Sequence, residues 1–110
     1  MKYVMDLTGK QMTVSLEPVE KKDENGKQKT ERNTGRPMWS TQVFVLDQDG
    51  GEVIAITTAG ERPNVKVGAL VSPVQLEIIP WAQIRNGNLR NGVAFRASEL
   101  LVPQVGKSAA

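Results

Sequence analysis

Short apolar runs rich in Val and Ile, each bounded by Gly, Pro, Asn or Asp, set the strongest limit on how this chain can fold. Apolar residues at helical spacing are scarce, whereas alternation of apolar and polar residues is typical of strands buried on one face. We therefore predict an all-β domain. The predicted strands cover residues 1–7, 11–17, 38–47, 52–58, 69–79 and 93–102.

The first two of these runs belong together. Thr8, Gly9 and Lys10 separate them, so residues 1–17 are expected to form one long bent strand or a hairpin. The next segment, 18–37, is charged and has almost no apolar side chains, which predicts a long loop. It contains an Asn-Gly pair, which favours a tight turn, so a protruding β-ribbon is also compatible with this sequence.

A second loop is predicted late in the chain. Pro80 is expected to end strand 69–79, because proline cannot donate a hydrogen bond to a neighbouring strand. Residues 81–92 follow and contain two Asn-Gly pairs, which are strong turn signals. Strand 93–102 comes next, and residues 103–110 are expected to form a flexible tail.

The order of these segments predicts a small five-stranded OB-like Greek-key barrel as one domain over residues 1–102. The order is a long first strand, a long loop, a tight hairpin, a connector, a long strand, a loop and a last strand. In an OB-fold, the loops after the first and fourth strands flank the face that binds oligonucleotides. An SH3-like barrel is the main alternative, because the connector 59–68 is too short and too rich in Gly and Pro for a good helix.

The two predicted loops also hold much of the positive charge. Residues 21–37 carry six Lys and Arg against three Asp and Glu, and residues 81–92 contain no acidic residue. The net charge is only +2, so its uneven distribution matters more than its total. The candidate nucleic-acid-binding residues are the cations and tryptophans in and beside these loops: Lys27, Lys29, Arg32, Arg36, Trp39, Trp81, Arg85, Arg90 and Arg96.

Each type of candidate has a chemical reason and a structural alternative. Arginine pairs phosphate through two hydrogen bonds, and a tryptophan stacking on a base contributes about 1–3 kcal/mol. The alternative for the cations is solvation of loop surface. The alternative for Trp39 is a place in the core, and for Trp81 a lid over it. Phe95 is predicted to be core, whereas Phe44 lies on a strand whose two faces both mix polar and apolar residues.

The composition excludes several kinds of chemistry. The chain has no Cys and no His, which removes disulfides, thiol nucleophiles, imidazole bases and nearly all transition-metal sites. We therefore expect a protein that is not an enzyme and that needs no cofactor or metal. No apolar run reaches the length of a transmembrane helix, and the N-terminal residues do not resemble a signal peptide, so a cytoplasmic location is expected.

Five short motifs carry a resemblance to a known family. They are Gly35-Arg36-Pro37-Met38-Trp39, Gly51-Glu52-Val53-Ile54, Val67-Gly68, Ile79-Pro80-Trp81 and Gly92-Val93-Ala94-Phe95-Arg96-Ala97. In this order they resemble the replication, integration and excision activators (Pra type) of actinobacterial integrative and conjugative plasmids. The resemblance spans roughly residues 25–100. It implies regulation of a mobile element and carries no catalytic signature.

The sequence thus favours a non-enzymatic regulatory protein that binds nucleic acid, with single-stranded DNA preferred, and that supports plasmid or mobile-element replication or transfer. The alternative is an interaction adaptor that recruits a protein partner, or a second copy of itself, by strand addition. Salt separates the two, because contacts with a phosphate backbone weaken steeply as the salt concentration rises.

Overall fold

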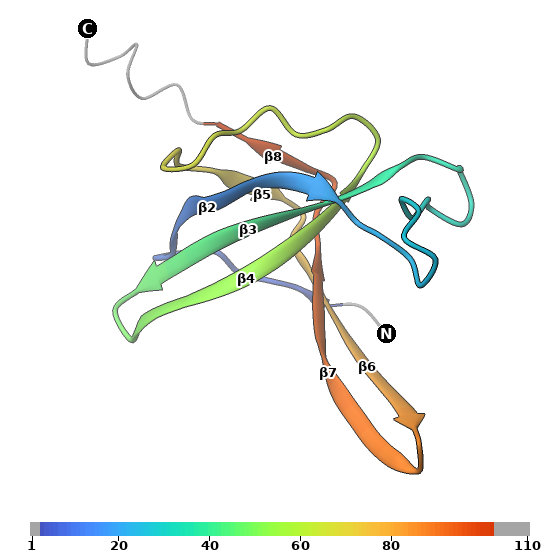
Figure 1. The fold of residues 1–110 in the computed structure, drawn as a ribbon. Coiled ribbons are helices and arrows are strands. Elements are labelled where there is room, and N and C mark those ends of the chain that lie inside the picture. Colours follow the sequence, from blue (N-terminus) through green and yellow to red (C-terminus); the bar gives the residue numbers. More distant parts are fainter. Residues whose placement is uncertain (1–2, 103–110) are drawn as a thin grey trace, which may run out of the picture.

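The computed structural model describes residues 3–102, apart from the side chain of Arg85, and its regular elements there are all strands (Figure 1). The predicted tail, 103–110, lies outside the described residues. None of the described segments forms a helix of the length and hydropathy that crossing a bilayer requires. The strands are β1 (Tyr3–Val4), β2 (Gln11–Glu20), β3 (Met38–Asp47), β4 (Gly50–Ala59), β5 (Ser72–Val74), β6 (Glu77–Arg85), β7 (Asn88–Arg96) and β8 (Glu99–Leu101).

Six strands form one sheet in the order β1-β6-β7-β4-β3-β2, and this sheet curls into a half-barrel (Figure 1). Its neighbours are antiparallel except for β4 and β7, which run parallel and pair at only two positions, Ile56 with Phe95 and Thr57 with Arg96. The strands β5 and β8 pair separately. The all-β prediction is confirmed and the shape is barrel-like, but eight strands in two sheets replace the predicted five.

The core lies on the inner face of the curled sheet. Alternate residues of β3 and β4, with Met12 and Val14 of β2, point into it. Leu16, which the alternation of residues 11–17 puts on the same face as Met12 and Val14, is exposed instead, because the register shifts after Val14. Leu76 and Ala97 join from the segments that flank β6 and β7, and Phe95 packs half-buried against the cluster. The buried apolar residues are Met12, Val14, Val43, Val45, Ile54, Ile56, Val65, Val71, Leu76 and Ala97.

The strand β3 has the predicted bounds, and its two faces are now distinguished. Thr41 and Val43 are fully buried, so the face that also carries Trp39 and Val45 points inward. Phe44 is 38% exposed, so the other face points to solvent. The outward face consists of Ser40, Gln42, Phe44 and Leu46.

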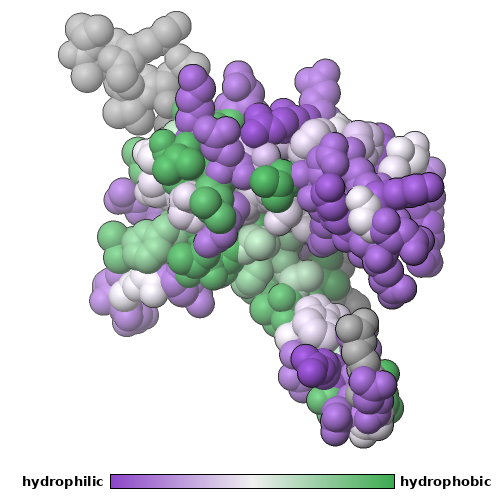
Figure 2. All heavy atoms as spheres, viewed as in Figure 1, coloured by the Kyte–Doolittle hydropathy of each residue, from purple (hydrophilic) through white to green (hydrophobic). Residues whose placement is uncertain are grey.

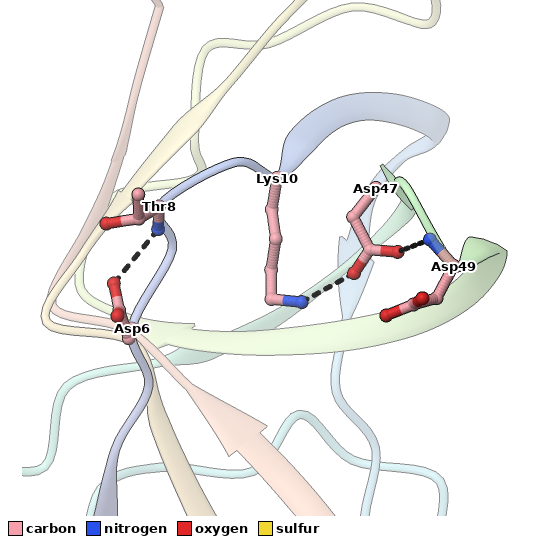
Figure 3. A network of polar contacts seen from close by, with 5 residues as sticks. All are labelled: Asp6, Thr8, Lys10, Asp47 and Asp49. Atoms are coloured by element: carbon pink, nitrogen blue, oxygen red, sulfur yellow. Dashed lines mark hydrogen bonds and ion pairs between the residues drawn. The ribbon is translucent and has the colours of Figure 1, made fainter.

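Residues 1–17 form neither one continuous strand nor a hairpin, because β1 pairs with β6 whereas β2 pairs with β3. Between them the chain turns at Gly9, where φ is +77°. Polar contacts hold this turn near the β3–β4 hairpin (Figure 3). Asp6 accepts a hydrogen bond from the Thr8 amide at 3.0 Å, and Lys10 Nζ lies 2.7 Å from Asp47 Oδ2.

The prediction of a loop over residues 81–92 is wrong, because these residues belong to a long β-hairpin. Pro80 does not end the strand: it pairs with Val93 on β7, and beyond Ile78 the other edge of β6 has no described strand beside it. A proline at such an edge loses no ladder hydrogen bond. Asn86 and Gly87 form the two-residue turn with φ of +54° and +80°, as a primed turn requires.

The long strands predicted over 69–79 and 93–102 are each broken. Gln75 adopts a φ of +52° between β5 and β6, which interrupts the first. The second is interrupted after β7, where the Ala97 amide donates to the Thr57 carbonyl and the Ser98 amide donates to the Val74 carbonyl. These breaks turn β5 and β8 away from the main sheet and close one end of the half-barrel (Figure 1).

The contact between Lys10 and Asp47 makes the stability of the fold depend on pH. The pKa of Asp47 lies below its ordinary value of 3.8, because Lys10 and then the Asp49 amide donate hydrogen bonds to the carboxylate. This stabilisation is present above pH 3.8 and is lost as the pH falls through the lower pKa of the folded state. We expect Asp47→Asn to lower the free energy of unfolding at pH 7 and to have a much smaller effect near pH 2.

Urea unfolding of the wild type and of this variant at both pH values tests this prediction. Asp49→Asn is the matched control, because the Asp49 carboxylate acts on Lys10 by its charge and without the hydrogen bond that Asp47 accepts, so its effect on stability should be much smaller than that of Asp47→Asn. An effect of Asp47→Asn that is equally large at pH 2 and pH 7 would contradict the prediction.

Candidate nucleic-acid interface

The loop after β2 is a folded ribbon over residues 21–37 (Figure 1). The Lys21 amide donates to the Met38 carbonyl, and the Lys29 amide donates to the Lys21 carbonyl, so the ribbon continues the pairing of β2 and β3. Its outer turn is held by Asp23, whose Oδ1 accepts hydrogen bonds from the amides of Asn25 and Lys27 at 2.8 and 3.0 Å. The charged segment therefore presents its cations from a defined backbone.

The second turn of the ribbon attaches it to the sheet. Glu31 accepts a hydrogen bond from the Thr34 hydroxyl at 2.7 Å and forms an ion pair with Arg96 on β7. Arg36 donates to the Ala59 carbonyl at 2.8 Å. The ribbon thus docks against the ends of β4 and β7 and lies beside the outer face of the sheet.

That outer face forms an uncharged platform, which we define as the outward-facing residues of β2, β3 and β4. Figure 2 shows hydrophobic residues over these strands and hydrophilic residues gathered on the ribbon at the right. Phe44, Leu46 and Val53 are 38%, 43% and 52% exposed. The strand register aligns the platform residues in rows across the sheet: Leu16, Val19, Ser40, Gln42, Phe44, Leu46, Val53, Ala55 and Thr57. Of these, Thr57 is buried, and Lys21 bonds to it.

Two exposed aromatic rings each cover a glycine of the adjacent strand. The Phe44 ring lies so close over Gly51 that a Cβ there would overlap it. Trp81 pairs with Gly92 across β6 and β7, and a Cβ on Gly92 would lie only 2.8 Å from Trp81 Cζ2. The glycines let both rings lie against the backbone and leave them partly open to solvent, which suits a surface on which bases stack.

The hairpin of β6 and β7 projects from the barrel as an arm, residues 79–94, that has a different character on each face (Figure 1). The register puts Trp81, Gln83 and Arg90 on one face, in line with Arg96 at the base of the arm. The opposite face is apolar, and its side chains are more exposed than most of the platform. Ile84 and Leu89 are 75% and 68% exposed.

A cleft of about 520 Å³ lies where β4 and β7 diverge. Platform residues, Glu52, Ile54 and the Val93–Phe95 segment of β7 line it, and Lys21 lies at the end where β4 and β7 pair. Lys21 Nζ donates to Thr57 Oγ1 at 2.8 Å. Burial lowers the pKa of Lys21, and the positive charges of Lys29 and Arg96 lower it further.

The predicted site residues divide into two groups. Three of them make contacts that hold the fold together: Arg36 and Arg96 through the bonds of the ribbon, and Trp39 because its Nε1 donates to the Gly60 carbonyl at 2.8 Å. The others are exposed. They are Lys27, Lys29 and Arg32 on the ribbon, and Trp81 and Arg90 on the arm.

The two basic segments approach each other only at the base of the arm. Arg96 contacts the ribbon, whereas Arg90 lies six residues further along β7, which is about 20 Å in an extended strand. Arg85 ends β6 at the tip of the arm, and its side chain is not described. The structure therefore joins the ribbon cations to Arg96 and separates them from the cation near the tip.

A second cleft, of about 460 Å³, lies between the ribbon and the base of the arm. It carries Arg32, Arg36 and Arg96, but Glu31 and Glu77 line it as well. Two of its three arginines already have partners, because Arg96 pairs with Glu31 and Arg36 donates to the Ala59 carbonyl, whereas Lys21 in the first cleft has no acidic partner in the part of the chain that the structure describes.

Sequence reasoning left out Lys21 as a site residue and Phe44 as an exposed ring. The signal for Lys21 is its position directly after a strand with alternating burial, where it lies opposite an outward-facing Thr. A glycine one hairpin turn away from an aromatic residue would have indicated Phe44, because glycine commonly lies beneath a ring that covers a strand.

Comparisons of the chain with protein-family models, with curated proteins and with solved structures gave no match. Within residues 3–102, no group of three His, Cys, Asp or Glu side chains is arranged to hold a metal ion. The candidate site is therefore defined by its own geometry.

The two tryptophans should respond differently to the same substitution. Trp39→Phe removes the hydrogen bond to Gly60 and should destabilise the fold by about 1 kcal/mol. Trp81→Phe keeps a ring over Gly92 and should leave stability nearly unchanged, because Trp81 is 43% exposed. Urea unfolding of both variants tests this, and equal losses of stability would contradict the assignment of Trp39 to the fold.

Proposed function

We propose that this protein is a non-enzymatic nucleic-acid-binding regulator that prefers single-stranded DNA and supports replication or transfer of a plasmid or mobile element. The observation that carries the proposal is the uncharged platform with an exposed Phe44, bordered by Lys21, Lys29 and Arg96 on the ribbon side and by the arm on the other.

The arrangement suits a single strand better than a duplex. The bases of a single strand are free to stack on Phe44 and Trp81, whereas those of a duplex are already stacked. The cations beside the platform, on the ribbon and on the arm, attract the phosphate backbone, and the side chains of the platform carry no charge that competes for it. Such binding tolerates many sequences, because every base offers a face for stacking.

The fold proposed for this function is an OB-type barrel. The five long strands β2, β3, β4, β6 and β7 support it, because the chain leaves β4, crosses the barrel and returns with β7 beside β4. On this proposal, the ribbon and the arm correspond to the two loops that flank the binding face of strands two and three in an OB-fold.

The resemblance to plasmid replication, integration and excision activators supports a regulatory role. A protein that holds exposed single strands is useful wherever a mobile element is copied or transferred, and it needs no catalytic residues for that task. The proposal therefore assigns the contacts to phosphates and bases and assigns no chemistry to the chain.

A second candidate function is recruitment of a protein, and the apolar face of the arm favours it. Ile84 and Leu89 are paired and exposed near the tip of this face, and Val93 is exposed on the same face nearer the base of the arm. Among residues 3–102, only β6 pairs with β7 at 88–94, so the other edge of β7 is open to an added strand there. This candidate predicts binding that depends on the apolar face and tolerates salt.

Fluorescence anisotropy of labelled single-stranded and double-stranded DNA, titrated at two salt concentrations, tests the proposed function. We expect tighter binding to the single strand and a steep fall in affinity with salt, since each phosphate contact contributes about 0.7 to the slope of log K against log salt. Absence of binding to either DNA at low salt would refute the proposal.

Variants of the platform and the arm test where the strand lies. Phe44→Ala and Arg90→Ala should each weaken binding of single-stranded DNA, the first by about 1–3 kcal/mol if one base stacks on the ring. Lys66→Ala is the matched control for Arg90→Ala, because Lys66 is an exposed cation on the connector away from the platform. Equal losses for Arg90→Ala and Lys66→Ala would show attraction by overall charge alone.

A further inference from the structure

The end of the cleft where β4 and β7 pair holds a partly buried cation without an acidic partner among the described residues. Lys21 bonds to Thr57, and within residues 3–102 no carboxylate oxygen lies within ion-pair distance of its ammonium group. Its charged neighbours are Lys29 and Arg96, both positive. A lysine that is partly shielded from water and surrounded by like charges is unfavourable in the free protein.

Other partly buried cations of the chain are compensated. Lys10 lies 2.7 Å from Asp47, and Arg96 is paired with Glu31. Cations without an acidic partner, such as Lys27 and Arg90, are exposed to water. Lys21 differs from both groups, because it is neither paired nor fully solvated.

We propose that Lys21, Thr57 and Ser40 form a binding position for one phosphate group of the nucleic-acid strand. The proposal rests on the proposed function and deepens it by naming where the backbone is anchored. Ser40 and Thr57 are paired across β3 and β4 and both line the cleft with Lys21. One ammonium group and two hydroxyl groups can donate hydrogen bonds to the oxygens of a phosphate.

The surroundings favour an anion at this end of the cleft and not at the other. The acid that lines the cleft, Glu52, lies five residues from Thr57 along β4, which is about 17 Å in an extended strand. Ala55 and Val93 lie between these ends and offer apolar contact to the sugar or base next to the phosphate. A strand anchored at Lys21 can then continue over the platform towards Phe44.

The proposal separates the effect of Lys21 on binding from its effect on stability. Lys21→Met keeps the apolar stem and removes the charge, so relief of the repulsion from Lys29 and Arg96 offsets the lost hydrogen bond to Thr57, and the free energy of unfolding should change little. The same variant should lose tenfold or more in affinity for an oligothymidylate, as expected for a hydrogen bond to a charged group. The salt slope should fall by about 0.7.

Thr57→Val and Lys22→Met complete the set. Thr57→Val keeps the shape of the side chain and removes the hydroxyl, so it should weaken binding in the same direction as Lys21→Met. Lys22→Met is the matched control: its side chain is 59% exposed, next to Lys21 in the chain, and 3.9 Å from Glu20. Equal affinities of Lys21→Met and Lys22→Met for the oligonucleotide would overturn the proposal.

A titration with inorganic phosphate, followed by amide NMR shifts, tests the position without DNA. Saturable shifts at Lys21, Ser40 and Thr57 in the wild type, absent in Lys21→Met, would support the site even if the protein bound no oligonucleotide, in which case only the proposed function would fail. Uniform shifts, or none at these residues, would overturn the phosphate site whatever the DNA experiments show.

Discussion

The short parallel contact between β4 and β7 is the constraint on which the rest of the structure depends. Only two residue pairs hold these strands together, and β4 is the partner that links the β6–β7 hairpin to the β2–β3–β4 sheet. The inner pair, Ile56 and Phe95, closes the core, while the outer pair, Thr57 and Arg96, faces the ribbon. Because the strands diverge beyond this contact, a cleft opens between them and the arm projects from the barrel.

Much of the fold follows from local sequence. The remaining parts are fixed by contacts with strands on the opposite side of the barrel. Strand β3 and the inward positions Met12 and Val14 of β2 were predictable, since alternation requires one buried face, whereas the irregularity that exposes Leu16 was not. Residues 81–92 were not, because Pro80 and the Asn-Gly pairs signal a loop and a hairpin turn equally well. A hairpin forms instead of a loop because β6 and β7 pair along their whole length.

The segments that carry the candidate cations could be named from the sequence, but the contacts of each cation could not. Charge runs and tryptophans indicated the ribbon and the arm, but sequence cannot show which cations the fold itself uses. Arg36 donates to the Ala59 carbonyl and Arg96 pairs with the Glu31 carboxylate, and both contacts hold the ribbon. Both guanidinium groups therefore already have partners in the free protein. Lys21 was overlooked because its importance comes from what surrounds it, namely burial and like charges supplied by residues distant in sequence.

An unpaired cation in a cleft also bears on how the protein discriminates among ligands. A carboxylate fixed opposite Lys21 would stabilise the free protein, but a phosphate would then have to displace it and affinity would fall. On the proposed phosphate position, a cation left without a partner is less favourable in the free protein, and a bound anion would recover that free energy. Repulsion among Lys21, Lys29 and Arg96 would then favour anionic ligands over neutral peptides at this end of the platform, whereas the apolar face of the arm would have no such preference.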